Sequence, residues 1–331
     1  MESSELPPRR THGTRDTQSS LSPTDLASAG FIGNSQGLRT AVALLKQFST
    51  TALPLLILGE TGTGKDVAAR AIHRWSGRRG AFVDVNCGAL PEHLVEGELF
   101  GHARGAFTGA RETRPGLVEA ARGGTLFLDE VGSLTQAAQA KLLRVLEAGE
   151  VRRLGDTRNR KVDFRLVAAG HAHLLDDRRM TFREDLLHRM GGIVVTLPPL
   201  REREEDAELI AEHYARLNDA TLDPGCRTVL RNNAWRGNIR ELLGAINRAS
   251  LLAPDRVITE RVLVSALGLG ATSRVLASPP PDSAWARRDA YLRACLARRW
   301  CVGEIARDSG AHRSTVYRWL KNHRLQVPRP A

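Results

Sequence analysis

The sequence predicts an α/β fold with a parallel sheet and a phosphate-binding loop, followed by a small all-α domain. Three observations support this prediction. A glycine-rich loop, Gly59–Lys65, follows an apolar run and precedes a helix-like run, which is the setting of a P-loop. Two later apolar runs end in polar side chains, at Asn86 and at Asp129-Glu130. Residues 302–322 read as two helices joined by a turn that contains glycine, which is the plan of a helix-turn-helix.

Composition limits the classes to which this protein can belong. Its 331 residues are 42% hydrophobic, which suits two or three domains with their own cores. The net charge of +11 favours an anionic partner. The four cysteines form no C-x-x-C pair, so we interpret them as reduced thiols rather than as a disulfide framework or a zinc site. No apolar run approaches the length of a membrane span, and the N-terminus lacks the apolar core of a signal peptide. We therefore expect a cytoplasmic protein without a membrane partner.

The N-terminal residues 1–29 are predicted to be a disordered tail. They are rich in Ser, Thr, Pro and Arg and show little apolar periodicity. The tail is too short for a sensory domain, so we expect no receiver domain ahead of the core. Leu38, Val42 and Leu45 then fall on one face of a helix that opens the folded part of the chain.

The loop after the first apolar run is a candidate ATP site. Its glycines would let backbone N–H groups close around phosphate oxygens, and the N-terminus of the next helix would add partial positive charge. Lys65 would reach the β- and γ-phosphates. The residues that we expect at the nucleotide are Gly59, Glu60, Thr61, Gly62, Thr63, Gly64, Lys65, Asp66 and Val67. The alternative is a glycine-rich turn with a surface lysine.

The acidic strand end after the P-loop is typical of a Walker B motif. Asp129 would hold Mg²⁺, and Glu130 would polarise the attacking water as general base. The alternative is a strand followed by an acidic turn. Asp66 stands where P-loops usually place the Ser or Thr that binds Mg²⁺, so another residue must help to hold the metal. From the residues alone, Asn86 is more often a turn residue than a catalytic one.

The segment between these strands, residues 97–110, has glycines around an aromatic side chain and a threonine. A flexible loop with Phe107 at its tip suits a contact surface that moves. The alternative, which the residues alone favour, is a buried phenylalanine in an irregular crossover.

Together these motifs resemble those of the bacterial sigma-54-dependent transcriptional activators, which are enhancer-binding proteins of the AAA+ superfamily. The resemblance covers residues 31–269 closely and residues 284–325 more loosely. It implies an AAA+ parallel sheet of strand order 5-1-4-3-2. The domains that we expect are a disordered tail (1–29), an α/β ATPase core (30–200), a helical lid (201–270), a linker (271–283) and a helix-turn-helix domain (284–331).

The resemblance also implies roles for single residues. Asn86 matches the asparagine that the family couples to its catalytic glutamate, here Glu130. Arg183 and Arg189 match the arginine fingers that a subunit inserts into its neighbour's site, and Arg240 matches the nucleotide-facing arginine of sensor II. The residues that would touch sigma-54 are Gly105, Ala106, Phe107, Thr108, Gly109 and Ala110.

One departure from the family concerns sensor I, which usually reads Thr-Asn. This chain has Gly170-His171 there. Glycine has no side chain to place a water, and histidine differs from asparagine in reach and titration. We expect ATP to bind still. The rate of hydrolysis and its coupling to loop movement are the properties that the departure affects.

The last predicted helix has an apolar face and a polar face. Val316, Trp319 and Leu320 recur at helical spacing and should pack inward. The outer face, which we expect to contact DNA, carries Arg313, Ser314, Tyr317, Arg318 and Lys321. The alternative is a solvated basic helix. The pattern resembles the Fis-type domain that ends many sigma-54 activators.

The functional hypothesis follows from these parts. Helix-turn-helix domains would bind upstream double-stranded DNA, and ATPase cores would assemble from a resting dimer into a hexameric ring. Hydrolysis would move the loop that carries Phe107 against sigma-54 RNA polymerase and convert a closed promoter complex to an open one. One rival is a DNA-binding co-regulator that binds ATP but hydrolyses it poorly because of Gly170-His171. Another is a different AAA+ motor, against which the Gly105–Ala110 loop argues.

Overall fold

The computed structural model describes residues 23–107, 110–176, 182–203 and 205–271, and in the C-terminal part residues 291, 292, 295, 302–309, 316, 319, 320 and 325. The chain divides into two compact units, Met1–Asp206 and Ala207–Ala331. Each unit is described by itself below.

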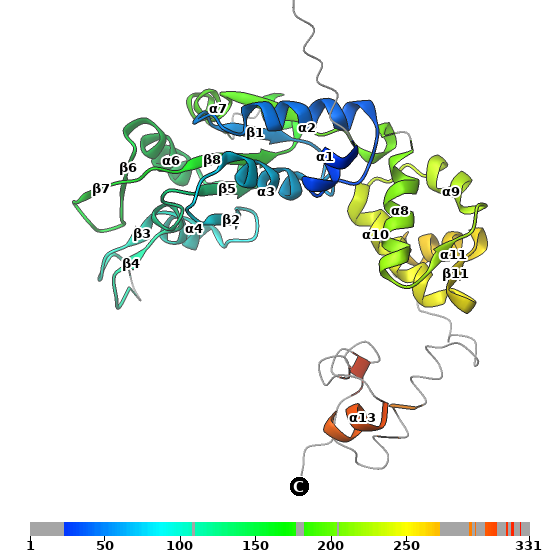
Figure 1. The fold of residues 1–331 in the computed structure, drawn as a ribbon. Helices are drawn as coiled ribbons and strands as arrows, with labels where there is room; N and C mark the ends of the chain where they lie inside the picture. The colour runs from blue at the N-terminus through cyan, green and yellow to red at the C-terminus, as the bar shows by residue number, and fades with distance from the viewer. Residues whose placement is uncertain are drawn as a thin grey trace, which may run out of the picture. The chain divides into compact units, whose positions relative to one another are not determined.

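The first unit is built on a five-stranded parallel sheet (Figure 1). Its strands are β1 (Leu55–Leu58), β2 (Phe82–Asn86), β5 (Thr125–Asp129), β8 (Arg165–Gly170) and β9 (Ile193–Thr196). The spatial order is β2-β5-β8-β1-β9, and every neighbouring pair is parallel. When these five strands are numbered 1 to 5 along the chain, the order from β9 to β2 is 5-1-4-3-2. The predicted α/β topology is therefore confirmed.

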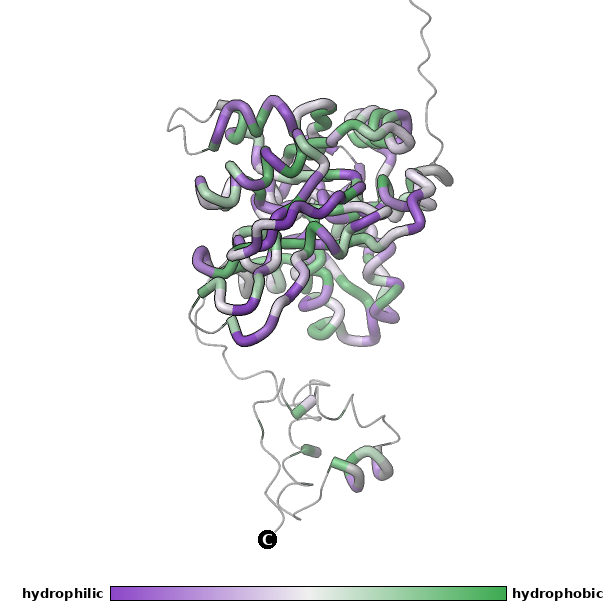
Figure 2. Tube along the Cα trace, turned by 90° about the vertical axis from the view of Figure 1, so that its left-hand side faces the viewer, coloured by the Kyte–Doolittle hydropathy of each residue, from purple (hydrophilic) through white to green (hydrophobic). Residues whose placement is uncertain are grey.

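Alternate side chains of the central strands enter two different cores, because successive residues of a strand point to opposite faces. Leu55 and Ile57 of β1 pack with one set of buried residues, whereas Leu56 and Leu58 pack with the other. The first core is covered by α1 (Pro23–Ser28), α2 (Gln36–Phe48) and α3 (Lys65–Ser76). The second is covered by α4 (Glu92–Phe100), α5 (Leu117–Ala120), α6 (Gln136–Ala148) and α7 (Glu184–Met190). Figure 2 shows hydrophilic and hydrophobic residues alternating along the helices, as amphipathic helices require.

The prediction of a disordered tail was wrong for residues 23–29. Residues 23–28 form α1, and the side chains of Leu26 and Ala29 are fully buried in the core that α2 and α3 also cover. The carbonyl oxygen of Ala29 also accepts a hydrogen bond from the Arg74 guanidinium at 2.7 Å. A single leucine on a six-residue helix gives no periodicity that a sequence pattern could detect. Residues 1–22 lie outside the described part of the chain.

Two short antiparallel hairpins extend away from the sheet (Figure 1). One pairs β3 (Gly101–His102) with β4 (Arg114–Pro115), and the other pairs β6 (Glu150–Arg152) with β7 (Asn159–Lys161). Leu154, between β6 and β7, joins the two hairpins: its N–H donates to Gly101 at 2.9 Å, and its carbonyl accepts from Ala103 at 2.8 Å. Three 3₁₀ turns complete the unit: η1 (Val131–Ser133), η2 (Ala172–Asp176) and η3 (Leu200–Glu202).

The second unit is helical where it is described. Its elements are α8 (Asp206–Leu217), β10 (Thr221–Leu222), α9 (Cys226–Asn232), α10 (Asn238–Leu252), η4 (Pro254–Arg256), β11 (Val257–Ile258), α11 (Glu260–Ala271) and α13 (Val302–Ser309). Trp235 is buried, and its indole N–H donates to the carbonyl of Leu230 at 2.8 Å. Within the described ranges, no helix combines the length and the apolar character that crossing a membrane would require.

The described C-terminal residues form a small core of their own. Leu292, Val302, Ile305, Val316 and Leu320 are buried together, with Trp319 packed against them. The predicted second helix, 302–308, is thereby confirmed, and Val316, Trp319 and Leu320, which were predicted to pack inward, lie at this core.

A buried arginine ties the start of β8 to the end of α2. Arg165 is 1% exposed and donates to the carbonyls of Phe48 and Thr51, both at 2.7 Å, and to that of Ser49. These carbonyls follow the last turn of a helix, where backbone acceptors lack intrahelical partners. Arg165 therefore supplies donors to carbonyls at and just after the end of α2.

We predict that Arg165→Met lowers the free energy of unfolding by about 3 kcal/mol, because it removes the guanidinium donor from all three carbonyls. Of the three, the Phe48 carbonyl keeps other donors, the N–H and the hydroxyl of Thr51. Urea denaturation measures the loss. Arg152→Met is the matched control, because Arg152 is exposed and donates to the side chain of Asn159 on its own hairpin. This substitution should cost less than about 0.5 kcal/mol. Equal losses in the two variants would contradict the role given to Arg165.

Candidate functional site

The loop between β1 and α3 has the backbone of a phosphate cradle. Gly62 and Gly64 have φ angles of 81° and 98°, a left-handed region that favours glycine. A Cβ at Gly59 would lie only 3.0 Å from the Thr63 hydroxyl. The α3 helix begins at Lys65, so its free N–H groups adjoin the loop. The predicted P-loop geometry is present.

Lys65 lies inside this loop rather than in solvent. Its side chain is almost buried, and its ammonium donates to the carbonyls of Gly59 at 3.0 Å and Glu60 at 2.9 Å. The alternative of a surface lysine is therefore wrong. The contacts hold a positive charge at the centre of the loop, where an anionic ligand would meet it.

The polar strand ends meet at one edge of the sheet. Asn86 and Asp129 are direct partners in the β2–β5 register. The Asn86 carboxamide oxygen accepts from the N–H groups of Gly88 and Ala89, both at 2.9 Å, so Asn86 also forms the turn that follows β2. Asp129 Oδ1 accepts from the N–H of Glu130 at 2.9 Å.

Gly88 lies against the Glu130 carboxylate, and the sequence analysis gave it no role. Glu130 has a left-handed backbone, with φ at 52°. A Cβ at Gly88 would lie 2.3 Å from Glu130 Oε2 and 3.4 Å from Asn86 Oδ1. A side chain at Gly88 would therefore displace the Glu130 carboxylate from its position beside the Asn86 turn. The available signal was a glycine two residues after a strand-ending asparagine.

The same edge is electronegative. Burial, with the charges of Asp129 and Glu130, raises the pKa of the Cys87 thiol to about 12. Burial also raises the pKa of Asp84, against the opposing effect of Arg70, and the charges of Asp129 and Asp66 add to the increase. Within the described ranges, no three His, Cys, Asp or Glu side chains are grouped so that they could hold a metal ion by themselves.

His171 brings the end of β8 onto the P-loop. Its Nε2 lies 3.3 Å from the Thr61 hydroxyl, and its ring stacks on His173 with centroids 5.3 Å apart. The backbone underneath is also joined, since the N–H of Gly59 donates to the carbonyl of Gly170 at 3.1 Å. A side chain at Gly170 would crowd Leu174, whose Cδ2 lies 3.1 Å from the ideal Cβ position.

Two arginines after β9 hold the loop from another side, and the sequence analysis gave them no role. Arg201 forms a bidentate ion pair with Glu60, at 2.8 and 2.6 Å. The fully buried Arg203 donates to the carbonyl of Thr63 at 2.9 Å and to that of Pro198 at 2.9 Å. Burial lowers the pKa of Arg203 to about 10, so it stays charged at neutral pH.

The remaining predicted site residues fall elsewhere. Arg183 and Arg189 are exposed at the two ends of α7, where Arg183 pairs with Asp185 at 2.7 Å and Arg189 donates to the carbonyl of Leu146 at 3.0 Å. Arg240 is exposed in the first turn of α10, in the second unit. The residues predicted to contact DNA, Arg313, Ser314, Tyr317, Arg318 and Lys321, lie outside the described residues, as do Thr108 and Gly109.

The loop after β3 presents Phe107 to solvent. Its side chain is 43% exposed and meets His102 edge-on, with ring centroids 5.0 Å apart. The N–H of Gly105 donates to the carbonyl of Ala110 at 2.8 Å, which closes the base of the loop. The alternative of a buried phenylalanine is therefore wrong.

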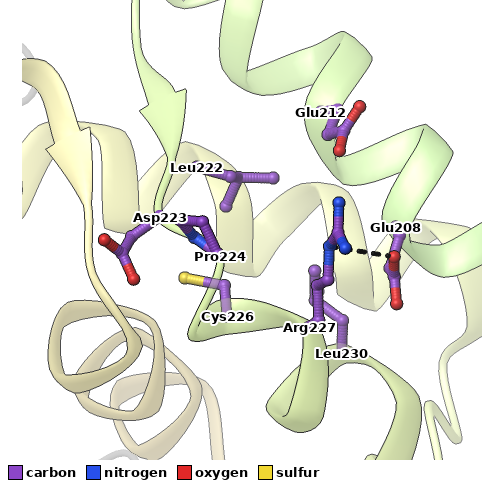
Figure 3. Close-up of a pocket in the computed structure, with 8 residues that line it drawn as sticks. All are labelled: Glu208, Glu212, Leu222, Asp223, Pro224, Cys226, Arg227 and Leu230. Atoms are coloured by element: carbon purple, nitrogen blue, oxygen red, sulfur yellow. Dashed lines mark ion pairs between the residues drawn. The ribbon is translucent and has the colours of Figure 1, made fainter.

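A small cavity in the second unit is a different kind of site (Figure 3). Its volume is about 60 Å³, and its lining residues are Glu208, Glu212, Leu222, Asp223, Pro224, Cys226, Arg227 and Leu230. Arg227 and Glu208 face each other as an ion pair at 3.6 Å. The space suits one or two waters and is too small for a nucleotide.

We predict that His171 titrates below the 6.5 of a free histidine, because burial, and then the charges of Lys65 and His173, lower its pKa. The stability contributed by the neutral imidazole is complete above pH 6.5 and is lost as the pH falls toward the folded-state pKa. NMR titration of the ring protons, assigned with His171→Asn, measures the midpoint. A midpoint above 6.5 would contradict the described surroundings of the ring.

Comparisons with known proteins agree with this site. The sigma-54 interaction domain family matches residues 31–196, and the AAA+ ATPase lid domain family matches residues 201–276. NtrX from Brucella abortus, crystallised with ADP, superposes with a TM-score of 0.66 at 30% identity, over 89% of this chain and 69% of that one.

Curated relatives extend the match. The nitric oxide reductase transcription regulator NorR2 of Cupriavidus necator is 49% identical over 234 residues, which is 68% of this chain and 45% of the relative. The alginate biosynthesis transcriptional regulatory protein AlgB of Pseudomonas putida is 42% identical over 309 residues, which is 89% of this chain and 68% of the relative. The chain spans about half the length of its NorR relatives. The chain belongs to the sigma-54 interaction domain family, the family of sigma-54-dependent AAA+ transcriptional activators.

Proposed function

We propose that this protein is an ATP-driven activator of transcription that remodels sigma-54 RNA polymerase into the open promoter complex. One observation carries the proposal. The P-loop, Asp129, Glu130 and Asn86 meet at one edge of the sheet, and the loop after β3, within the range that the sigma-54 interaction domain family matches, presents an exposed Phe107. A site for nucleotide hydrolysis and a surface for a protein partner thus belong to one unit.

ATP binding rests on the loop Gly59–Lys65 with Asp66 and Val67. Lys65 would exchange its two carbonyl partners for the β- and γ-phosphates, which are better acceptors because they are charged. Arg240 of the lid would face the same nucleotide. The NtrX structures, solved with ADP and with ATP, support this choice of ligand. Mg²⁺, which Asp129 would hold, supplies charge neutralisation for the phosphates.

Hydrolysis would be carried by the residues beside Gly88. Glu130 would accept a proton from the attacking water, and the Asn86 turn would fix where its carboxylate lies. Arg183 and Arg189 would complete the site of a neighbouring subunit by stabilising charge on the γ-phosphate. Their exposure on α7 supports this role, and it requires a ring, for which we propose a hexamer that assembles from resting dimers.

Motion would pass from the site to the loop through α4. This helix starts at Glu92, shortly after the Asn86 turn, and ends at Phe100, next to β3. Val95, Leu99 and Phe100 are buried, so α4 would move as a rigid body with the turn. The loop Gly105–Ala110 would then press on sigma-54. Helix-turn-helix domains, through the outer-face residues of the last predicted helix, would hold the ring at upstream DNA.

The departure at Gly170-His171 raises a second candidate function. In that case the protein binds ATP and DNA as a co-regulator but hydrolyses ATP slowly. His171 occupies the sensor position and contacts Thr61, so a side chain with hydrogen-bonding capacity is present there. That contact favours the hydrolysing activator over the co-regulator.

We predict that Phe107→Ala abolishes sigma-54-dependent open-complex formation and leaves phosphate release within about twofold of the wild type. The side chain is exposed and packs only on His102 among its described ring contacts, so its loss removes a contact surface rather than a core residue. Permanganate footprinting of promoter DNA measures opening. Leu44→Ala, another exposed apolar residue of the unit, lies on α2 rather than on α4; it is the matched control and should open promoters normally. Full opening by Phe107→Ala would refute the loop assignment.

A further inference from the structure

A buried amide joins two parts of the first unit that would serve two different nucleotide sites. Gln139 lies in α6 and is 1% exposed, so water does not compete for its side chain. Its Nε2 donates to the carbonyl of Leu134 at 2.8 Å. Its Oε1 accepts from the backbone N–H of Arg183 at 2.8 Å.

The two partners determine which residue type can make this bridge. Leu134 offers a carbonyl acceptor and Arg183 an N–H donor, so the side chain between them must both donate and accept. An ionised carboxylate cannot donate, an ammonium cannot accept, and asparagine is one methylene shorter. Glutamine supplies both groups on one side chain, and the orientation of its amide is fixed by its partners.

The Leu134 end of the bridge belongs to the subunit's own hydrolytic site. The turn η1 begins directly after Glu130, and the N–H of Ser133 donates back to the Glu130 carbonyl at 2.9 Å. Val131 is buried, and its Cγ1 lies 3.7 Å from the ideal Cβ position of Gly170, in the sensor segment. The N–H of Leu134 donates to Val131 at 3.2 Å, so the carbonyl that Gln139 contacts is part of this turn.

The Arg183 end of the bridge lies at the surface of the first unit. Arg183 is the N-cap residue of α7, and its carbonyl accepts from the N–H of Leu187 at 3.0 Å. Its backbone is therefore held by the helix on one side and by Gln139 on the other, while its guanidinium stays exposed beside Asp185. The amide fixes the base of a side chain whose charged end points outward.

We propose that Gln139 is a positioning residue that couples the hydrolytic site of one subunit to the arginine that this subunit presents to its neighbour. The inference rests on the proposed ring with shared sites. A shift of the turn after Glu130 moves the Leu134 carbonyl, the amide follows, and the backbone of Arg183 is displaced. One site thereby alters the reach of the arginine that serves the next site.

Rings assembled from two different inactive variants test the two ends of the Gln139 bridge one at a time. The first parent, called the finger donor, carries Lys65→Ala and keeps Arg183 and Arg189. The second parent, called the site holder, carries Arg183→Ala with Arg189→Ala and keeps Lys65. Neither parent alone should release phosphate, and their mixture should regain activity. Gln139→Met, which matches glutamine in length but removes donor and acceptor, is then placed in one parent at a time. Gln136→Met, at an exposed position of α6, is the control.

The expected result is asymmetric. Gln139→Met in the finger donor lowers the restored rate about tenfold, whereas in the site holder, which lacks the arginines, it lowers the rate less than about twofold. Gln136→Met changes neither mixture. Equal losses in both placements, a loss confined to the site holder, or no loss overturns the proposal.

A second variant guards against a folding defect. Gln139→Leu is close to glutamine in size and removes both the donor and the acceptor without burying a charge, and it should show the same asymmetry. Melting temperatures of all variants are measured in parallel. If the unaltered parents regain no activity when mixed, the shared-site proposal itself fails, and this inference with it. If they do and the Gln139 variants show no donor-side loss, only this inference fails.

Discussion

Parallel pairing of the central strands is the constraint on which the site depends. Because the strands run in one direction, their carboxyl ends meet at one edge, and the register there places Asn86 opposite Asp129 and Leu58 opposite Gly170. A slip of one residue would exchange the two cores, since alternate side chains of each strand pack on opposite faces. The packing of alternate side chains into the two cores therefore also fixes the positions of the polar residues at the edge.

The P-loop is held by contacts from distant parts of the first unit. His171 reaches Thr61 from the end of β8, and Arg201 and Arg203 reach Glu60 and Thr63 from η3. These contacts fix the loop before any ligand arrives, which reduces the ordering that binding requires. If a nucleotide moved the loop, its contacts with His171 would change. Its contacts with Arg201 and Arg203, which lie just before the end of the first unit at Asp206, would change too.

Local pattern was enough to predict strands β1, β2 and β5, the loop and the acidic strand end, whereas the strand order came from the resemblance to the family. Strand, glycine loop and helix are consecutive in sequence, and the residues of the carboxyl edge each end an apolar run. Contacts between distant residues were not predictable in this way. Arg203 and Thr63 are 140 residues apart, and the partners of Gln139 lie in different elements. Gly88 was missed because its role depends on where Glu130 lies, and α1 because one buried leucine on a short helix has no period.

The central claim is that the subunits share their sites, and the dependence of phosphate release on protein concentration tests it most directly. Steady-state release by purified protein is measured over a concentration series that spans assembly, with His171→Asn beside it. The account requires the rate per subunit to rise cooperatively with concentration, because each site is incomplete without a neighbour's arginines. A rate per subunit that is constant over the series would show that a single chain hydrolyses ATP alone. Absence of activity in the wild type, restored by His171→Asn, would favour the co-regulator instead.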